Sequence, residues 1–275
     1  MGTEHYIYRR DGNIRVYRVG GGEPVLLIHG SRNSGWTWRG VIGELSRHFA
    51  CYVVDLPGFD RSDIPPRKYS MDDFAEAMVE VMDAAGLEQT HIIGEHTGAV
   101  LGVLLAAKYP QRIKKLVLDG LLFWNSDQGK VIWEKFFLPD FTDTTAYHLP
   151  VVSLVSWEKA KATGQGNVAG RSIEEAHESD REVWEKQEEI HRRSRLWERY
   201  SYKSITQCDI VAAGARVKAP TLLLCGDRDV ARHSAEKARA GIKGSILTWV
   251  SDCPGYVHAQ QPDQLVKEAL AFLKA

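Results

Sequence analysis

The sequence lacks the features that mark several large classes of protein. Only four of its 275 residues are cysteines, and none belongs to a Cys-x-x-Cys pair or to a cysteine–histidine cluster with zinc spacing. Its longest apolar runs are far shorter than the roughly 18 residues that a membrane span needs. A disulfide framework, a metal site and a transmembrane segment are therefore not expected.

An excess of charge of either sign is also missing. Lys and Arg total 35 and Asp and Glu total 36, so the formal net charge is −1. Nucleic-acid binders usually carry a basic excess or stripe, and no such partner is expected. The chain has neither GxxxxGK[ST] nor a GxGxxG after a strand, so no nucleotide is implied and we expect the protein to need no cofactor.

The N-terminal segment has no apolar run of the kind found in signal peptides. Together with the few cysteines, this predicts a cytoplasmic protein. We expect it to act on a small-molecule substrate away from membranes, as a monomer or a homodimer.

Six short apolar runs recur along the chain and have the length of buried strands. They cover residues 24–28, 50–54, 90–93, 115–118, 221–225 and 246–250. Helical spacing of apolar residues appears between them, over 71–85, 99–109 and 264–273. This alternation predicts an α/β fold with a mostly parallel central sheet and helices on both faces. An Asp11-Gly12 turn within residues 5–19 predicts a β-hairpin there, before the first of these apolar runs.

Residues 121–215 interrupt the alternation. They hold five of the eight tryptophans and a highly charged helical stretch at 173–202. We predict that this segment is a helical cap or lid, inserted into a core made of residues 1–120 and 216–275. Because the cap is rich in tryptophan, we expect a largely apolar pocket beneath it.

Residues 94–98, Gly-Glu-His-Thr-Gly, follow a predicted strand and open a predicted helix. This is the setting of a nucleophile elbow, in which glycines permit a tight turn and the central side chain stands above the sheet. Backbone N–H groups beside that side chain can stabilise a developing oxyanion. The usual central residue is serine, and here it is His96.

At this point the chain resembles the α/β-hydrolase-fold family over nearly its whole length. His29-Gly30-Ser31, with Trp36 and Trp38 following, is similar to the family's oxyanion loop, and residues 55–62 resemble its D-x-P-G-x-G-x-S loop. Asp229 stands in the place of the catalytic acid. The resemblance puts the catalytic histidine at Gly255, seven residues before Pro262, and leaves His258 three residues further on. Both the serine and the histidine of the triad are thus replaced.

These substitutions predict an atypical enzyme in which neutral His96 is the general base or the nucleophile. Its place at a helix N-terminus predicts a pKa at or below the ordinary value near 6.5. Asp229, Asp119 and His258 are the candidates to orient its ring. By resemblance, the N–H groups of Ser31 and Thr97 form the oxyanion hole. Further candidate substrate-binding residues are His29, Arg32, Trp36, Trp38, Trp124 and Trp133.

Three functions fit this pattern. The first is hydrolysis of a small, largely apolar ester, lactone or similar carbonyl compound. The second is a non-hydrolytic reaction on the same scaffold, by a lyase, isomerase, cyclase or cofactor-free oxygenase, and the third is ligand binding by an inactive relative. An acid or second histidine within about 2.6–3.2 Å of the His96 ring would favour catalysis. A ring sealed by apolar side chains would favour binding.

Overall fold

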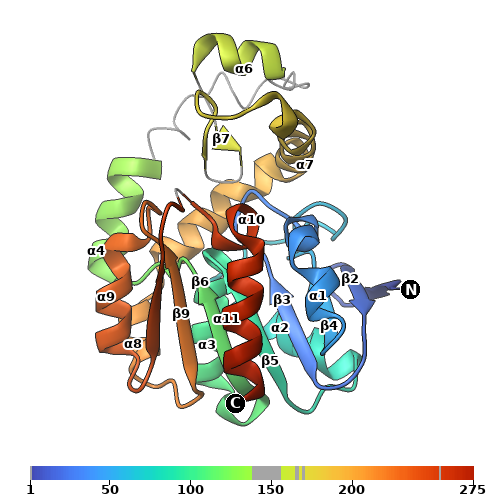
Figure 1. The fold of residues 1–275 in the computed structure, drawn as a ribbon. Coiled ribbons are helices and arrows are strands. Elements are labelled where there is room, and N and C mark those ends of the chain that lie inside the picture. The colour runs from blue at the N-terminus through green and yellow to red at the C-terminus, as the bar shows by residue number, and fades with distance from the viewer. Residues whose placement is uncertain (1, 138–155, 165–166, 169–170, 254) are drawn as a thin grey trace.

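The computed structural model describes residues 2–137, 156–164, 167–168, 171–253 and 255–275. Its main sheet has the strand order β1-β2-β4-β3-β5-β6-β9-β10 (Figure 1). The strands are β1 (Thr3–Ile7), β2 (Ile14–Val19), β3 (Pro24–Ile28), β4 (Ala50–Val54), β5 (Thr90–Glu95), β6 (Ile113–Asp119), β9 (Thr221–Gly226) and β10 (Ile246–Val250). All six predicted apolar runs are strands of this sheet.

Strands β3 to β6, β9 and β10 are parallel, and the β1–β2 hairpin joins this set antiparallel through β2 and β4. Successive side chains of β3 point to opposite faces, so Leu26 and Ile28 enter one apolar cluster and Val25 and Leu27 the other. A strand buried on both faces must be apolar throughout, which explains the continuous runs. The predicted α/β class is confirmed.

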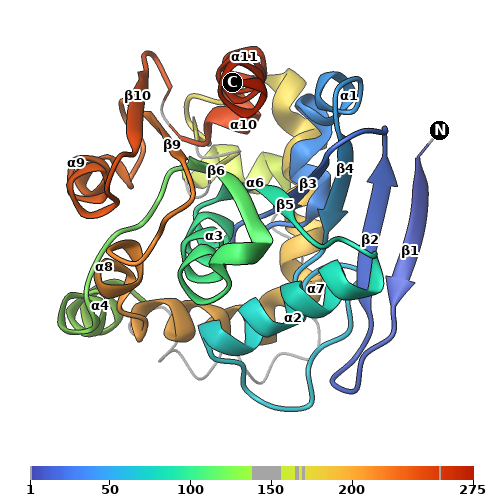
Figure 2. The same ribbon diagram turned by 90° about the horizontal axis from the view of Figure 1, so that it is seen from below.

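Helices cover both faces of the sheet (Figure 2). On one face lie α1 (Ile42–Leu45) and α11 (Pro262–Lys274); on the other lie α2 (Met71–Ala84), α3 (Thr97–Lys108) and α8 (Ile210–Gly214). Helix α9 (Arg232–Gly241) packs beside β9 and β10, and α10 (Val257–Gln260) precedes α11. No helix in the described residues is both long and apolar enough to cross a membrane.

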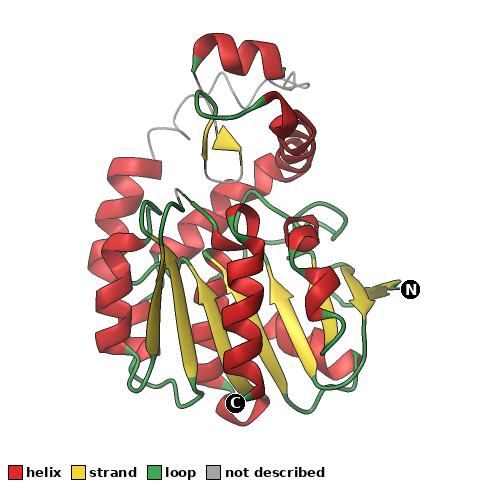
Figure 3. Ribbon diagram, viewed as in Figure 1, coloured by secondary structure: helices red, strands yellow, loops and turns green. Residues whose placement is uncertain are grey.

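The described part of the chain between β6 and α8 projects beyond the carboxyl ends of the strands (Figure 3). Its described elements are α4 (Ser126–Ile132), a π-helical turn (Trp133–Phe137), α6 (Trp157–Thr163), the hairpin β7 (Asn167–Val168) and β8 (Arg171–Ser172), and α7 (Arg181–Thr206). Part of the predicted cap, residues 138–155, lies outside the described residues. Trp157 and Trp184 pack around Ile173 in a small apolar cluster within this segment.

Helix α7 joins the projecting segment to the core. The Trp197 ring packs against Tyr69 and lies over Gly58, where a Cβ would come within 2.1 Å of the indole. The Trp124 indole N–H donates to the Ile205 carbonyl over 3.3 Å, and the Ser204 hydroxyl donates to the Tyr69 carbonyl. These contacts hold α7 above the loops that follow the strands.

Candidate functional site

His96 occupies a strained turn between β5 and α3. Its backbone has φ 43° and ψ −101°, which costs a non-glycine residue about 1–3 kcal/mol. A Cβ on Gly94 would lie 2.4 Å from the Gly98 carbonyl oxygen, and one on Gly98 would lie 2.0 Å from the Ile28 oxygen. The two glycines thus let the strand and helix approach closely enough to make the turn.

The ring of His96 lies against Asp229, in the loop after β9. Nε2 of His96 is 3.2 Å from Oδ2 of Asp229, and the other carboxylate oxygen accepts the Ala231 N–H over 2.6 Å. In the neutral ring, Nε2–H donates to Asp229 and Nδ1 keeps its lone pair. Nδ1 has no hydrogen-bond partner among the described residues, and the His96 side chain is 13% exposed.

The prediction that His96 has a depressed pKa is wrong. Burial does lower the pKa, but the charge of Asp229 and its hydrogen bond outweigh burial and raise the pKa of His96 to about 9. The pKa of Asp229 is correspondingly lowered: burial would raise it, and the contact with His96 wins. A helix N-terminus is a fractional positive charge, whereas Asp229 is a full negative charge in contact with the ring.

The other predicted partners, Asp119 and His258, bind each other. Asp119 Oδ2 lies 2.8 Å from Nδ1 of His258 and accepts the His258 N–H over 3.0 Å, while Nε2 lies 2.6 Å from the Thr37 hydroxyl. Both side chains are fully buried. Asp119 touches His96 only through the backbone, where its carbonyl accepts the His96 N–H over 2.9 Å. The structure therefore brings Asp229, and not this pair, to the ring of His96.

Tyr256 separates the two histidines, and the sequence analysis did not select it. Its ring centroid is 4.7 Å from that of His96 at an interplanar angle of 80°. On the other side it stacks on His258, 5.7 Å away and 8° from parallel. The signal that could have found it is its position directly after Gly255, where the resemblance predicted the catalytic histidine.

The loop after β3 is fastened to the elbow. The buried Glu95 carboxylate accepts the Gly30 N–H, and the Thr97 hydroxyl accepts the Ser31 N–H over 3.1 Å. The Ser31 hydroxyl lies 2.9 Å from that of Thr97 and 2.8 Å from that of Ser201 in α7. One of the two expected oxyanion donors thus already has an acceptor. The Thr97 N–H, in the first residue of α3, has no partner within the helix.

Arg32 links this loop to α7. Its Nε lies 3.0 Å from the buried Glu198 carboxylate, whose other oxygen lies 2.7 Å from Nε2 of His191. Arg32 has φ 65°, a left-handed conformation that non-glycine residues rarely adopt. Half of its side chain remains exposed, so it keeps donors available for a ligand.

Several other predicted site residues lie in the core. The fully buried His29 ring accepts the Leu56 N–H over 2.9 Å and donates to the Gly30 carbonyl; burial lowers its pKa to about 4. Trp38 is buried against His258, and Trp124 is buried under the end of α7. Their apolar faces contribute to packing, which sequence spacing alone does not distinguish from pocket lining.

The two remaining tryptophans are partly exposed. Trp36 lines a cleft of about 210 Å³, where the Arg39 guanidinium lies 3.6 Å from its ring centroid. Trp133 is in the π-helical turn, with the Lys203 ammonium 6.0 Å from its ring centroid. The tryptophan-lined pocket stays a prediction.

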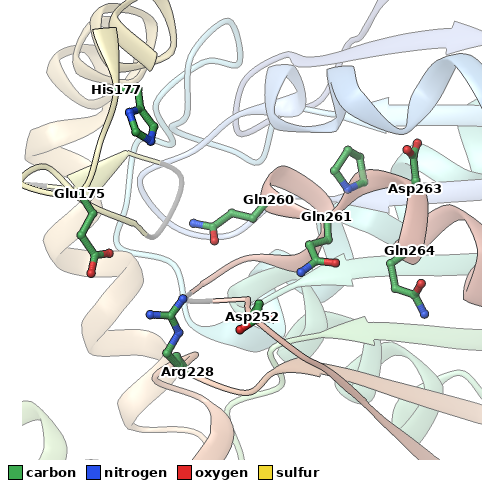
Figure 4. Close-up of a pocket in the computed structure, with 9 residues that line it drawn as sticks. Glu175, His177, Arg228, Asp252, Gln260, Gln261, Asp263 and Gln264 are labelled. Atoms are coloured by element: carbon green, nitrogen blue, oxygen red, sulfur yellow. The ribbon is translucent and has the colours of Figure 1, made fainter. Parts of the chain in front are cut away.

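A polar cavity of about 720 Å³ adjoins the loops that carry Asp229 and Tyr256 (Figure 4). Arg228 and Gln260 face Glu175 and His177 of the projecting segment across it. Among the described residues, no group of three or more His, Cys, Asp or Glu side chains could hold a metal ion.

The elbow, the acid after β9 and the parallel sheet define a class of protein, the α/β hydrolases. Residues 23–239 match the family described as alpha/beta hydrolase fold. The chain belongs to this family.

Curated relatives match only in part. A 2-hydroxy-6-oxo-2,4-heptadienoate hydrolase of Pseudomonas putida is 30% identical over 154 residues, covering 53% of this chain and 56% of the relative. Epoxide hydrolase 4 of Mus musculus is 28% identical over 124 residues, covering 43% of this chain and 34% of the relative. The chain spans little more than half the length of the first and about a third of the second.

Solved structures match over the whole chain. A hydrolase from Pseudomonas aeruginosa PA01 has a TM-score of 0.79 and 22% identity, with 99% of each chain covered. E-2-(acetamidomethylene)succinate hydrolase has a TM-score of 0.79 and 17% identity, with 100% of each chain covered. At these identities the likeness shows a shared fold.

Proposed function

We propose that the protein is a hydrolase of a small carbonyl compound, such as an ester or lactone, and that His96 and Asp229 are its working pair. The contact of 3.2 Å between Nε2 of His96 and the Asp229 carboxylate carries the proposal. It fixes one ring nitrogen and leaves the other for chemistry. An aspartate that orients an imidazole and stabilises its charged form is what acyl-transfer catalysis requires.

In this proposal Nδ1 of His96 removes a proton from water as the water attacks the carbonyl carbon. The protonated ring is stabilised by Asp229, and the proton is later returned to the leaving oxygen. In the nucleophilic version Nδ1 attacks the carbon itself and the alkoxide leaves as an acyl-imidazolium forms; water then hydrolyses this intermediate, and its proton goes to the alkoxide. The Thr97 N–H, at the positive end of α3, faces the charge that develops on the carbonyl oxygen. Hydrolases among the relatives support the reaction class.

The raised pKa of His96 favours one second candidate, a lyase or isomerase. With a pKa of about 9, the ring is mostly an imidazolium at neutral pH. An imidazolium can protonate a substrate or polarise its carbonyl, as non-hydrolytic reactions on this scaffold would require.

The pH dependence of kcat/KM separates the two, with p-nitrophenyl acetate as the first probe of hydrolysis and candidate small carbonyl compounds tried next. A base loses activity when protonated, so hydrolysis should rise with pH through an ionisation near 9. A general acid loses activity when it is deprotonated, so a kcat/KM that falls with pH through the same ionisation supports the second candidate. A pH profile with no ionisation near 9, or a wild-type rate equal to that of His96→Ala, overturns both.

A further inference from the structure

We propose that Tyr256 is a catalytic residue whose phenol donates a hydrogen bond to the substrate oxygen that gains negative charge. This inference rests on the proposed function, because it assigns a second group to the same site. Tyr256 would take the functional place of the catalytic imidazole that the resemblance expects at Gly255.

The backbone around Tyr256 is held in place. The Asp119 carboxylate accepts the N–H groups of the two residues that follow it, Val257 over 3.3 Å and His258 over 3.0 Å. The Tyr256 carbonyl accepts the N–H groups of Ala259 and Gln260 at the start of α10. A donor that is already in position loses little freedom when it binds a charged oxygen.

The ring of Tyr256 is fixed between two imidazoles. His258 forms the rigid side of this arrangement, since Asp119 and Thr37 hold its two ring nitrogens at 2.8 and 2.6 Å. His96 forms the other side, in edge-to-face contact with the tyrosine ring. The buried histidine–aspartate pair thus positions Tyr256, and Tyr256 lies in contact with the residue that we assign to the chemistry.

The hydroxyl of Tyr256 is an available donor. Tyr256 is half-buried, and its hydroxyl makes no hydrogen bond to any residue that the structure describes. Burial raises the pKa of the phenol, and the negative charges of Glu95 and Asp229 raise it further, so the group keeps its proton.

The site has one free oxyanion donor fewer than expected. The Ser31 N–H, one of the two backbone donors expected for the oxyanion, already donates to the Thr97 hydroxyl. With that group engaged, the Thr97 N–H would act alone. A phenol O–H from Tyr256 restores a second donor.

Tyr256→Phe tests the inference, because it removes the hydroxyl and keeps both ring contacts. In p-nitrophenyl acetate hydrolysis we expect kcat to fall about 100-fold, as it does when one oxyanion donor is removed, with KM changed less than about threefold. Tyr52→Phe is the matched control: it removes a hydroxyl that accepts from Arg18 over 3.1 Å in the β2–β4 region, and its kcat should equal that of the wild type. A Tyr256→Phe enzyme with unchanged kcat overturns the inference.

Acetate binding supplies a readout that does not need turnover. At pH 7 acetate should bind beside the His96 imidazolium and shift its NMR signals, and Tyr256→Phe should weaken that binding about tenfold by removing a hydrogen bond to a charged oxygen. Equal affinity in the two proteins, or no saturable binding to the wild type, overturns the inference. If the wild type hydrolyses no ester, the proposed function fails, and acetate binding still decides the role of Tyr256.

Discussion

Two histidine–aspartate pairs lie on either side of Tyr256, and they differ in almost everything but composition. His258 and Asp119 are fully buried and joined at 2.8 Å, with a hydroxyl on the second ring nitrogen. His96 and Asp229 are joined at 3.2 Å, on a strained turn, with the histidine partly exposed and its second nitrogen without a described partner.

This difference indicates which pair can do chemistry. A ring with both nitrogens engaged in the interior cannot exchange a proton with a substrate, but it can hold its neighbours in place. A ring with one nitrogen fixed and the other open has the arrangement of a catalytic base. The residue types are equal in the two pairs, so the surroundings assign the roles.

The largest expected effect comes from removing the open histidine. His96→Ala should lower kcat/KM about 10³-fold, which is within the range of a lost general base. At neutral pH it should also lower the free energy of unfolding by up to about 3 kcal/mol, because the buried Asp229 carboxylate loses its partner. Steady-state kinetics and urea unfolding measure the two quantities. Full turnover by this variant would make His96 a bystander.

His258→Ala should act mainly on stability rather than directly on the chemistry. It leaves the buried Asp119 carboxylate without its closest partner and opens a cavity beside Trp38. We expect the free energy of unfolding to fall by about 3–4 kcal/mol, with any loss of activity following from the displaced Tyr256. If His258→Ala folds as stably as the wild type, the structural role that we give this pair is wrong.

The ion pair at the open site should also make stability depend on pH. The pKa of His96 is raised from about 6.5 to about 9, so the pair stabilises the folded state fully below pH 6.5 and progressively less up to pH 9. The shift corresponds to about 3 kcal/mol at most. Urea unfolding at pH 6, 7.5 and 9.5 should show this loss in the wild type.

Asp229→Asn is the control for that loss. With the carboxylate gone, burial acts with less opposition, and the pKa of His96 should return to its ordinary value near 6.5 or below. The fall in stability between pH 6.5 and 9 should then disappear. An unchanged pKa of His96, measured by NMR titration of the ring, would show that other charges set it.

The sequence was sufficient for the strands, for the tight turn at His96 and for the position of Asp229 in the loop after β9. A strand buried on both faces needs an apolar run, and a tight strand–helix turn needs Gly94 and Gly98, so both leave local signals. Asp229 could be placed because the loop around it has a recognisable spacing. Each of these features is specified by neighbouring residues.

The sequence was not sufficient for properties that depend on contacts between distant segments. The pKa of His96 is set by a residue 133 positions away, and Tyr256 acquires its position from two rings on different loops. For Trp38 and Trp124 the sequence pattern is the same whether the side chain lines a pocket or fills the core. Only the packed structure separates these cases.

The smallest expected effect comes from adding one methyl group behind His96. Gly120 has φ 64°, and a Cβ there would lie 2.4 Å from Cδ2 and 2.5 Å from Nε2 of His96. The ring of a Gly120→Ala variant must therefore move away, which lengthens the hydrogen bond to Asp229.

For Gly120→Ala we expect a fall in kcat of about 10- to 30-fold, as for a modest misplacement of a catalytic group, together with a lower pKa of His96. Gly86→Ala is the matched control, since Gly86 has φ 68° and nothing within 4 Å of its would-be Cβ. Both substitutions carry a backbone strain of about 1 kcal/mol, so unfolding should register a similar cost from this source in each. Only Gly120→Ala should lose activity, because only there does the new methyl group displace the open histidine. An equal loss in both variants would attribute the effect to backbone strain and remove the contact between Gly120 and His96 from the mechanism.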